Sequence, residues 1–397
     1  MKLNVSQIVE IYEKMKSNHV VIYGAGKNGV RVHETLIRHG FEVDAVADRV
    51  VGRGFYKHKT VSLSTLCDGA RNQVCIISLV ASVPEIRELL ENYFDVVIDD
   101  DITRWMDYFV PEGWEGLTYE VCVPFNHYES PYPNEEDLIY AKRMVSEDHL
   151  VDVNLNVEKQ LELAGRITPY CSEYKKWIHS GEKTRYQNNT WYGEGDAALL
   201  HGMMREFKPQ RIVEIGSGFS TCVMLDTNER WMNGDVSISC IEPRPQRLHE
   251  NLIDYDNNKI FIYERNVQDV PLRFFEELEE NDFLFIDSSH VAKAGGDVLY
   301  EYFQILPALR KGVVIHIHDI VYPFYYPEGW IRQGRAYNEA YIVRALLSGN
   351  STYQVTYFNH YMSTMQRDVL TENDSKGIMC DGGTSLWLKK NDNTKIG

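Results

Sequence analysis

The chain has 397 residues, which is more than a single hydrophobic core usually supports, so two domains are expected. Hydrophobic residues make up 44% and charged residues 25%, an ordinary globular composition that excludes a disordered or fibrous chain. The 41 basic and 58 acidic side chains give a net charge of -17. This charge disfavours nucleic acid and anionic lipid as partners and makes a neutral or cationic small molecule easier to bind.

The cysteines and the apolar runs bear on where the protein works. Seven cysteines are an odd number, and none has the C-x-x-C spacing, which predicts reduced thiols in a cytoplasmic protein. The amino-terminal segment carries acidic residues in place of a basic head and an apolar core, and no apolar run reaches about 18 residues. We therefore expect a cytoplasmic protein without a membrane span. The sequence leaves open whether it forms a homo-oligomer.

Residues 1–106 predict a Rossmann-like α/β domain. An apolar strand at His19–Tyr23 runs into a glycine turn, and a helix and a strand ending at Asp48 follow. Further strands at 74–80 and 95–99 flank another helix. The result is two βαβ units, about half of a full dinucleotide-binding fold.

The glycine turn of this domain has the G-x-G-x-x-G spacing of dinucleotide-binding sites. Its glycines are Gly24, Gly26 and Gly29, and Asp48 stands 19 residues further on, where the fingerprint has an acidic partner for a ribose hydroxyl. Amide groups at the start of the following helix can hold phosphate. Two interpretations stay open, because no second nucleotide-binding half follows. The turn forms a pocket for a nucleotide or nucleotide-sugar, or the domain is a scaffold or dimerisation module.

Residues 107–152 are interrupted by prolines and lose their periodicity, which indicates a linker leading into a second domain at 153–397. The helices expected in this domain include Val157–Ile167, Gly195–Phe207, Gly296–Leu309 and Ala336–Leu347. Its seven expected strands are RIVEI, VSISCIEP, KIFIYERNVQDV, DFLFIDSSH, GVVIHIHDI, YQVTYFNH and TSLWLKK. The predicted fold class is therefore α/β, with two doubly wound Rossmann-like domains, the second with a seven-stranded sheet.

The second glycine turn carries an acidic-x-Gly-x-Gly pattern at Glu214–Gly218, and acidic residues follow the next two strands at Glu242 and Asp269. With these motifs in order, residues 196–390 resemble the class I S-adenosylmethionine-dependent methyltransferases, although Ser220 stands where many members have a third glycine. The resemblance implies that Glu242 binds the ribose hydroxyls and Asp269 contacts the adenine amino group. Glu214 has an alternative role, because a carboxylate also stabilises the start of a helix. The cofactor-binding residues assigned in this way are Glu214, Gly216, Ser217, Gly218, Glu242, Asp269 and Asp287.

Polar side chains follow the fourth and fifth expected strands of this domain. Asp287 and His290 come after FLFI, and His318 and Asp319 end the strand that contains His316. Because the carboxyl ends of parallel strands meet at one edge of a sheet, we expect these side chains to converge there. His316 lies deeper in its strand, so we expect it in the core and His318 exposed.

Two kinds of chemistry fit this cluster. Methyl transfer to a hydroxyl needs a group that removes the proton, and a neutral histidine suits that task, so His290 or His318 is the expected base, with Asp287 beside it. Alternatively, Asp287, His318 and Asp319 bind a divalent cation that holds the acceptor hydroxyl, as similar positions do in metal-dependent O-methyltransferases. A histidine departs from the all-oxygen ligand set of those enzymes and would suit a softer metal. A third interpretation is that these residues only cap helices and tie loops.

An aromatic segment follows Asp319. We expect a lid or substrate wall there, because so much apolar area stays exposed unless it covers something; the residues are Tyr322, Tyr325, Tyr326 and Trp330. The alternative is a loop packed at an interdomain interface. The SSH and HDI strand ends, the YPEGW loop, the YNEAY helix and the segment Asn126–Pro133 resemble a bacterial methyltransferase subgroup often found with glycan and secondary-metabolite genes.

The sequence therefore predicts an S-adenosylmethionine-dependent methyltransferase that acts on a hydroxyl of a sugar, glycan or related small molecule, with an accessory N-terminal domain. A second hypothesis is an NAD-dependent oxidoreductase, or a nucleotide-sugar-binding protein, that uses the first glycine turn. A third is a nucleotide sensor with a degenerate methyltransferase body. Glu242, Asp269 and the seven-strand order argue against the oxidoreductase, and the intact polar cluster at Asp287–His290 and His318–Asp319 argues against the degenerate sensor.

Overall fold

A computed structural model describes residues 11, 14–16, 18–52, 54–67, 73–78, 84–99, 130–147, 150–187, 189, 191–252, 259–373 and 378–391. The chain separates into two compact units, one within residues 1–121 and one within 122–397, and each is described by itself. The first half of the predicted linker, residues 107–129, lies outside the described residues. The domain boundaries given by the sequence therefore stay predictions.

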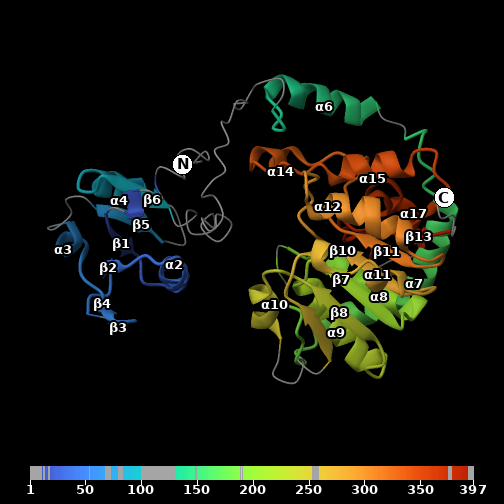
Figure 1. Cartoon of the computed structure of the whole chain (residues 1–397), viewed down its shortest axis with the longest axis horizontal. Coiled ribbons are helices and arrows are strands. Elements are labelled where there is room, and N and C mark those ends of the chain that lie inside the picture. The colour runs from blue at the N-terminus through green and yellow to red at the C-terminus, as the bar shows by residue number, and fades with distance from the viewer. Residues whose placement is uncertain are drawn as a thin grey trace. The chain divides into compact units, whose positions relative to one another are not determined.

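The N-terminal unit is built on a parallel sheet with the strand order β2-β1-β5-β6 (Figure 1). Its strands are β1 (His19–Tyr23), β2 (Val43–Ala47), β5 (Gln73–Ile77) and β6 (Val96–Asp99). Val20 and Ile22 of β1 join one core cluster and Val21 and Tyr23 another, because successive side chains of a strand point to opposite faces. Both faces of this sheet are therefore buried, as is usual for parallel sheets.

Short elements complete the N-terminal unit as far as it is described: α2 (Lys27–Arg38), α3 (Leu63–Cys67), α4 (Pro84–Glu91), β3 (Gly54–Phe55) and β4 (His58–Lys59). Helix α2 places Val32 and Leu36 in the core one helical turn apart. The sequence does not predict α3 or the β3–β4 hairpin. Segments of two to five residues are too short to show a hydrophobic period.

The C-terminal unit has the predicted seven-stranded sheet, in the order β12-β13-β11-β10-β7-β8-β9 (Figure 1). Its strands are β7 (Arg211–Ile215), β8 (Ser237–Ile241), β9 (Ile260–Tyr263), β10 (Phe283–Ile286), β11 (Val314–Ile317), β12 (Tyr353–Phe358) and β13 (Leu386–Lys390). All neighbouring pairs are parallel except those of β13, which runs antiparallel to β11 and β12. The chain leaves β7 toward β8 and returns on the other side of β7 as β10, so a ligand crevice is expected at the carboxyl ends of β7 and β10.

Helices cover both faces of this sheet (Figure 1). Those described are α6 (Glu135–Glu147), α7 (Val157–Ile178), α8 (Glu194–Phe207), α9 (Phe219–Trp231), α10 (Gln246–Asn251), α11 (Arg273–Glu276), α12 (Asp297–Tyr300), α13 (Leu306–Ala308), α14 (Glu328–Arg332), α15 (Glu339–Leu347), α16 (Asn359–Met365) and α17 (Arg367–Asn373). The sequence predicts that α7 ends at Ile167, because Pro169 cannot donate a helical hydrogen bond. The helix continues because it packs tightly on α8: a Cβ on Gly202 would lie 2.8 Å from the sulfur of Cys171.

The predicted helix Gly296–Leu309 is present but contains a π-helical segment, Glu301–Ile305, between α12 and α13. Single π turns are rare and occur frequently at functional sites. Glu301, the first residue of this segment, is fully buried and accepts a hydrogen bond from the Ser288 hydroxyl at 3.1 Å. The irregularity therefore lies beside the residues that follow β10.

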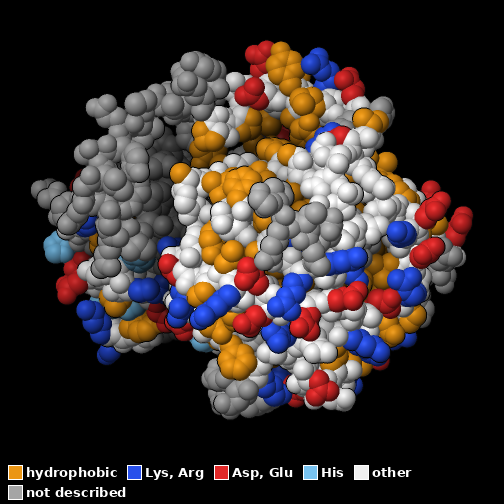
Figure 2. Space-filling view, turned by 45° about the vertical axis from the view of Figure 1, so that its right-hand side comes forward, with side chains coloured by type: hydrophobic (Ala, Val, Ile, Leu, Met, Phe, Trp, Pro, Cys, Tyr) orange, Lys and Arg blue, Asp and Glu red, His pale blue; other side chains and the backbone are white. Residues whose placement is uncertain are grey.

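The surface carries charges of both signs. On the face drawn in Figure 2, basic and acidic side chains are interspersed across the C-terminal unit. None of the described helices has the length and apolar character needed to cross a bilayer. The described cysteines are free thiols, which agrees with the predicted reducing compartment, while the localisation itself stays a prediction.

Candidate active site

The glycine turn after β7 lies against the end of β10. Gly216 has φ +80°, and a Cβ at this position would lie 1.8 Å from the backbone oxygen of Asp287. The Gly216 N–H donates to the Ile241 carbonyl at 3.0 Å, and the Asp287 N–H donates to the Ile215 carbonyl at 2.9 Å. The turn therefore needs glycine for two reasons: its backbone conformation and the close approach of a neighbouring strand.

Glu214, two residues before Gly216, stabilises this turn through side-chain hydrogen bonds. Its side chain is fully buried and accepts hydrogen bonds from Ser220 Oγ at 2.6 Å and Thr221 Oγ1 at 2.5 Å. Burial raises the pKa of Glu214 to about 7, although the two hydroxyl donors act against the rise. These contacts fit the helix-capping interpretation of Glu214 better than direct cofactor contact. Ser220, which departs from the glycine pattern, supplies one of the donors.

Glu242 follows β8 and lies beside the same turn. Its Oε2 accepts the Ser217 N–H at 3.2 Å, and its Oε1 accepts the Arg244 N–H at 2.8 Å. Partial burial raises the pKa of Glu242, against the lowering effect of these two amides. Each carboxylate oxygen keeps a further acceptor position, which suits a vicinal diol such as that of a ribose. Asp269 lies exposed in a 3₁₀ turn after β9.

Arg247 lies across the glycine turn. A Cβ on Gly218 would lie 3.4 Å from Arg247 Cδ, and the Arg247 guanidinium lies over the ring of Trp191 at 4.7 Å. Its charge lowers the pKa of both Glu242 and Asp287. The crevice after β7 is therefore bordered by a cation on the side of α10.

The side chains that follow β10 and β11 converge as the sequence predicts. His290 Nε2 lies 3.3 Å from Asp287 Oδ1 and 3.5 Å from Asp319 Oδ2. Its other nitrogen, Nδ1, lies 2.8 Å from Glu339 Oε2. The imidazole is thus surrounded by three carboxylates, of which Asp287 is the most accessible at 29% exposure, against 5% for His290.

This surrounding changes the expected role of His290. Burial alone would lower the pKa of His290, but Asp287, Glu339 and Asp319 outweigh burial and raise it well above its usual value. These carboxylates therefore disfavour the neutral imidazole that the base prediction requires of His290. Burial would raise the pKa of Asp287, but His318 and His290 outweigh burial and lower it, so this carboxylate stays ionised.

Glu339 was not singled out by sequence reasoning, although it belongs to the YNEAY motif. It is fully buried at the start of α15, and Tyr302 donates its hydroxyl to the second carboxylate oxygen at 2.8 Å. The N–H groups of Asn338 and Glu339 also donate to the His290 carbonyl at 3.0 and 3.3 Å. A buried acidic residue that opens an apolar helix was the signal available in the sequence. The helix also begins three residues later than the predicted Ala336, because these contacts occupy its first residues.

The two histidines of β11 are both buried, so the prediction that His318 is exposed is wrong. His316 stacks on Phe285 with ring centroids 3.7 Å apart, and burial lowers its pKa well below the usual value, as expected for a core histidine. His318 is 3% exposed because the ring of Tyr192 covers it at 5.0 Å. Burial would lower the pKa of His318, but Asp287 and Asp319 outweigh burial and raise it.

The residues predicted to hold a divalent cation do not suit one as they are placed. The positive imidazole of His290 stands between Asp287 and Asp319, where a shared cation would have to stand. His318 Nε2 lies 3.8 Å from Asp319 Oδ1, and Thr384 donates its hydroxyl to the same oxygen. Among the residues described, no group of three or more His, Cys, Asp or Glu side chains has a metal-binding arrangement. No role for a metal follows from this cluster.

The predicted substrate wall is only partly at the surface. Tyr326 is 6% exposed and accepts the Ala340 N–H at 3.0 Å, and Tyr322 packs on Tyr361 with centroids 5.0 Å apart. Tyr325 and Trp330 are half-buried. The ring that reaches the carboxylate cluster is Tyr337, whose centroid lies 4.9 Å from that of His290. Sequence reasoning did not assign this residue.

The first glycine turn, in the N-terminal unit, is also tightly packed. Gly24 has φ +113°, and a Cβ on Gly29 would lie 2.0 Å from the Gly24 carbonyl oxygen. Gly26 stands immediately before α2, and no atom of the described residues lies within 4 Å of where its Cβ would be. The space above Gly26 is therefore open for a ligand at the start of the helix.

Asp48 makes the same contacts in this unit as Glu242 makes in the other. Its Oδ2 accepts the Ala25 N–H of the turn at 2.7 Å, and its Oδ1 accepts the Val50 N–H at 3.0 Å. In each unit the acidic residue after the second strand thus binds one amide of the glycine turn and one amide two residues beyond itself. The two turns therefore share the same local hydrogen-bond geometry.

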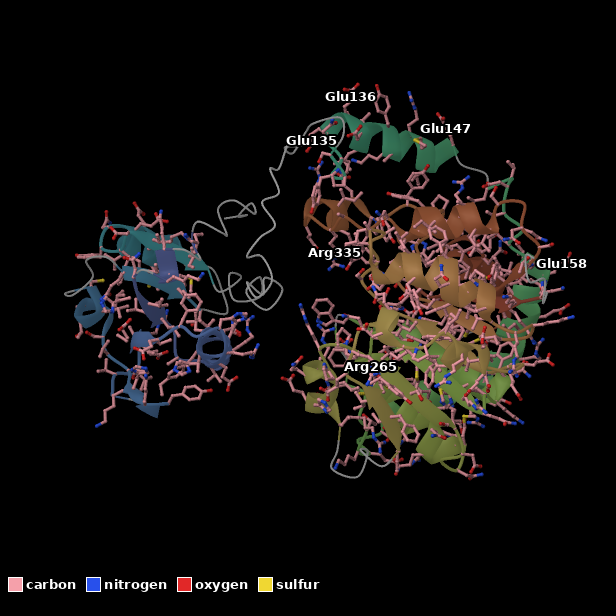
Figure 3. All side chains as sticks on the ribbon, in the orientation of Figure 1. Glu135, Glu136, Glu147, Glu158, Arg265 and Arg335 are labelled. Carbon is pink, nitrogen blue, oxygen red and sulfur yellow. The ribbon has the colours of Figure 1, made fainter. Side chains whose placement is uncertain are left out.

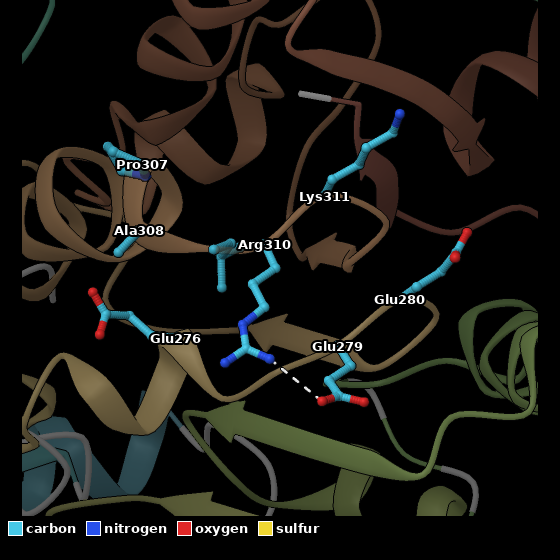
Figure 4. A pocket seen from close by; sticks show the side chains of 8 residues that line it. Glu276, Glu279, Glu280, Pro307, Ala308, Arg310 and Lys311 are labelled. Carbon is cyan, nitrogen blue, oxygen red and sulfur yellow. Dashed lines mark hydrogen bonds and ion pairs between the residues drawn. The ribbon is translucent and has the colours of Figure 1, made fainter. Parts of the chain in front are cut away.

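A cavity of about 470 Å³ lies elsewhere, between Glu276–Glu280 and Pro307–Lys311 (Figure 4). These segments precede β10 and β11, whereas the glycine turn and Asp287 follow strands of the same sheet. The cavity therefore lies at the amino ends of the strands, away from the crevice. Its lining is charged, and an ion pair between Arg310 and Glu279 at 3.3 Å crosses it.

Residues 213–320 match the family model described as a methyltransferase domain. An uncharacterized protein of Archaeoglobus fulgidus is 33% identical over 168 residues, which are 40% of this chain and 74% of that protein. The O-methyltransferase TomG of Streptomyces achromogenes, solved with S-adenosylmethionine, is 15% identical and covers 65% of this chain and 97% of its own, with a TM-score of 0.33. A methyltransferase of Podospora anserina bound to S-adenosylhomocysteine is 16% identical and covers 58% and 96%, with a TM-score of 0.34.

The sheet order, the glycine turn and the family match agree with one another. Through its C-terminal part the chain belongs to the class I S-adenosylmethionine-dependent methyltransferases and shares a family with the archaeal protein. It is an enzyme, and its cofactor is S-adenosyl-L-methionine.

Proposed function

We propose that the protein is an O-methyltransferase that acts on a hydroxyl of a sugar, glycan or related small molecule. The observation that carries this proposal is the position of Asp287: its backbone oxygen packs against the glycine turn, and its carboxylate is the most accessible of the three around His290. One residue thus connects the place where the cofactor is expected with the place where an acceptor can enter. The aromatic rings of Trp330 and Tyr337 next to it suit the face of a sugar.

The residues present fit the cofactor. Gly216 and Gly218 keep the turn compact, because Cβ atoms there would lie 1.8 Å from the Asp287 carbonyl oxygen and 3.4 Å from Arg247 Cδ. In this proposal the methionine part lies against the turn backbone, Glu242 accepts the ribose hydroxyls, and the exposed Asp269 meets the adenine amino group. When bound, S-adenosyl-L-methionine supplies an electrophilic methyl group: the acceptor oxygen bonds to its carbon, and the carbon–sulfur electron pair returns to sulfur. Arg247 borders the same crevice and offers a cation to the cofactor carboxylate.

Asp287 is the group we assign to the acceptor proton. As an ionised carboxylate it accepts the hydrogen bond of the acceptor hydroxyl, orients the oxygen and takes the proton as the oxygen–carbon bond forms. His290 holds the Asp287 carboxylate in place through its Nε2, and Glu339 in turn orients the imidazole through Nδ1. His290 is therefore a positioning residue in this proposal, and His318 adds positive charge near the same carboxylate.

Binding of S-adenosylhomocysteine tests the cofactor site without knowledge of the acceptor. We expect Glu242→Gln to weaken this binding about 10- to 100-fold in calorimetry, because the charged acceptor of the ribose hydroxyls is lost. Glu264→Gln is the matched control, since Glu264 is a mostly exposed glutamate after the adjacent strand β9. Equal affinities of the two variants would overturn the assignment of Glu242.

Transfer of a labelled methyl group to a panel of sugars, polyols and phenols tests the acceptor class. We expect Asp287→Asn to lose turnover while its affinity for S-adenosylhomocysteine stays within about threefold, because the carboxylate acts on the acceptor. Unchanged turnover would remove Asp287 from the mechanism. Transfer to amines or thiols in place of hydroxyls would refute the O-methyltransferase proposal.

A second proposal concerns the N-terminal unit. We propose that it binds a nucleotide or nucleotide-sugar, because Asp48 repeats the contacts of Glu242 and the space above Gly26 is open. Titration with NAD and with a UDP-sugar should show binding that Asp48→Ala abolishes and that Asp44→Ala, four residues before Asp48, does not. No binding of either compound would favour the scaffold or dimerisation role.

A further inference from the structure

Arg335 is held between two aromatic rings beside the carboxylate cluster. Its guanidinium carbon lies 5.0 Å from the ring centre of Trp330 and 5.5 Å from that of Tyr337. The two rings lie nearly perpendicular to each other, with centroids 6.1 Å apart. Figure 3 labels Arg335 just beneath α14. Contacts with two rings stabilise the position of the guanidinium, so a ligand that binds it pays little ordering entropy.

Arg332, the last residue of α14, differs from Arg335 because it pairs with acidic side chains. Arg332 forms two hydrogen bonds with Glu135, at 2.7 and 2.8 Å, and one with Glu328 at 2.7 Å. Arg335 has no carboxylate within ion-pair distance in the part of the chain that the structure describes. In a protein with a net charge of -17, a half-buried arginine left without an acidic partner stands out from the general charge pattern.

Arg335 is also fixed relative to the catalytic cluster. Tyr337 contacts Arg335 on one side and His290 on the other, with ring centroids 4.9 Å apart in the second contact. Three residues after Arg335, the backbone N–H of Asn338 donates to the His290 carbonyl at 3.0 Å, and Asn338 Oδ1 accepts the Ala292 N–H at 2.6 Å. The ring of Tyr337 therefore lies between the guanidinium and His290.

The chemistry of a guanidinium defines the ligand. Its N–H groups form a planar fork that matches a carboxylate or a phosphate, and neither ring can accept these hydrogen bonds in the plane. The carboxylates of the cluster, Asp287, Asp319 and Glu339, lie within ion-pair distance of His290. An anionic group on the substrate would complete the hydrogen bonds of Arg335 and place the rest of the molecule toward Asp287.

We propose that Arg335 binds an anionic group of the methyl acceptor, so that the substrate is an acidic sugar carrying a carboxylate or a phosphate. This inference rests on the proposed function, because it takes Asp287 as the group that faces the acceptor. An anionic substrate differs from the expectation based on the net charge of the whole chain, which favours a neutral or cationic substrate. The overall field acts at long range, whereas a desolvated ion pair acts at contact distance.

The test uses the full-length protein saturated with S-adenosylhomocysteine and three probes: glucose, glucuronate and glucose 6-phosphate. We expect at least one anionic probe to bind about tenfold more tightly than glucose in calorimetry. Arg335→Met should remove this preference while the affinity for S-adenosylhomocysteine stays unchanged. Arg310→Met, which removes the same charge at the opposite edge of the sheet, should keep the preference. The two anionic arms distinguish a carboxylate from a phosphate.

The results separate this inference from the proposed function. Equal binding of all three probes, no binding of either anion up to about 10 mM, or a preference that survives Arg335→Met would each overturn the anionic-acceptor inference. Loss of S-adenosylhomocysteine binding by Glu242→Gln is independent of these outcomes. A protein that binds S-adenosylhomocysteine but shows no anion preference would keep its proposed methyltransferase chemistry and lose only this role of Arg335.

Discussion

Replacement of Gly216 by alanine tests how the crevice is built. Two costs combine at this position. A left-handed backbone costs an alanine about 1–2 kcal/mol, and the new methyl group would lie 1.8 Å from the Asp287 carbonyl oxygen, a contact that a rigid backbone cannot relieve without moving. Forcing atoms into a packed site typically costs about 1–3 kcal/mol. The entropy that alanine removes from the unfolded chain offsets about 0.4–1 kcal/mol.

We therefore expect Gly216→Ala to destabilise the C-terminal unit by about 2–4 kcal/mol, which lowers its Tm by roughly 5–15 °C for a unit of this size. Gly234→Ala is the matched control, because Gly234 has φ +76° with nothing within 4 Å of its Cβ position. It should cost about 1 kcal/mol or less. Tryptophan fluorescence during urea unfolding reports this unit, since Trp177 and Trp387 are buried in its core.

Binding of S-adenosylhomocysteine adds a second measurement. A displaced Asp287 backbone also displaces the turn, so Gly216→Ala should weaken binding about 100-fold, whereas Gly234→Ala should leave it unchanged. Equal unfolding free energies for the two variants would show that the contact with Asp287 is not rigid. The explanation of the crevice given above would then be refuted.

Three further predictions concern the ionisable groups Glu214 and His290 and the predicted metal site. Burial raises the pKa of Glu214 to about 7 from a usual value of 4.5, so the folded protein binds this proton more tightly than the unfolded chain does. The free energy of unfolding should therefore fall by about 3 kcal/mol as the pH rises between these values. Glu214→Gln should flatten this part of the pH profile, measured by urea unfolding at several pH values. His290 has a raised pKa, so its contribution to the free energy of unfolding is complete below about pH 6.5 and is lost as the pH rises through the raised value. His290→Gln should abolish this loss at alkaline pH and cost about 3–5 kcal/mol at neutral pH. An unchanged pH profile would contradict the three-carboxylate arrangement. Exhaustive chelation should leave methyl transfer intact, and activity that returns only with added Mg²⁺ would contradict the placement of His290 between Asp287 and Asp319.

The sequence by itself determined the architecture of the second domain. Its strands are short apolar runs that end in glycine, acidic or histidine residues, and such runs keep their register because both faces of each strand are buried. Strand β7 has the predicted bounds, Arg211–Ile215, and the seven strands form the predicted doubly wound sheet with an additional strand pair. The convergence of Asp287, His290, His318 and Asp319 was also predictable, because parallel strands end at one edge.

Tertiary structure alone decided the protonation and exposure of these residues. The sequence placed His316 in the core and His318 at the surface, and only the packing of Tyr192 on His318 shows that both are buried. Likewise His290 looks like a base in the sequence, yet Glu339, 49 residues away, holds its second nitrogen and keeps it charged. A pKa depends on all the charges and solvent around a group, and these come from distant segments that no local pattern reveals.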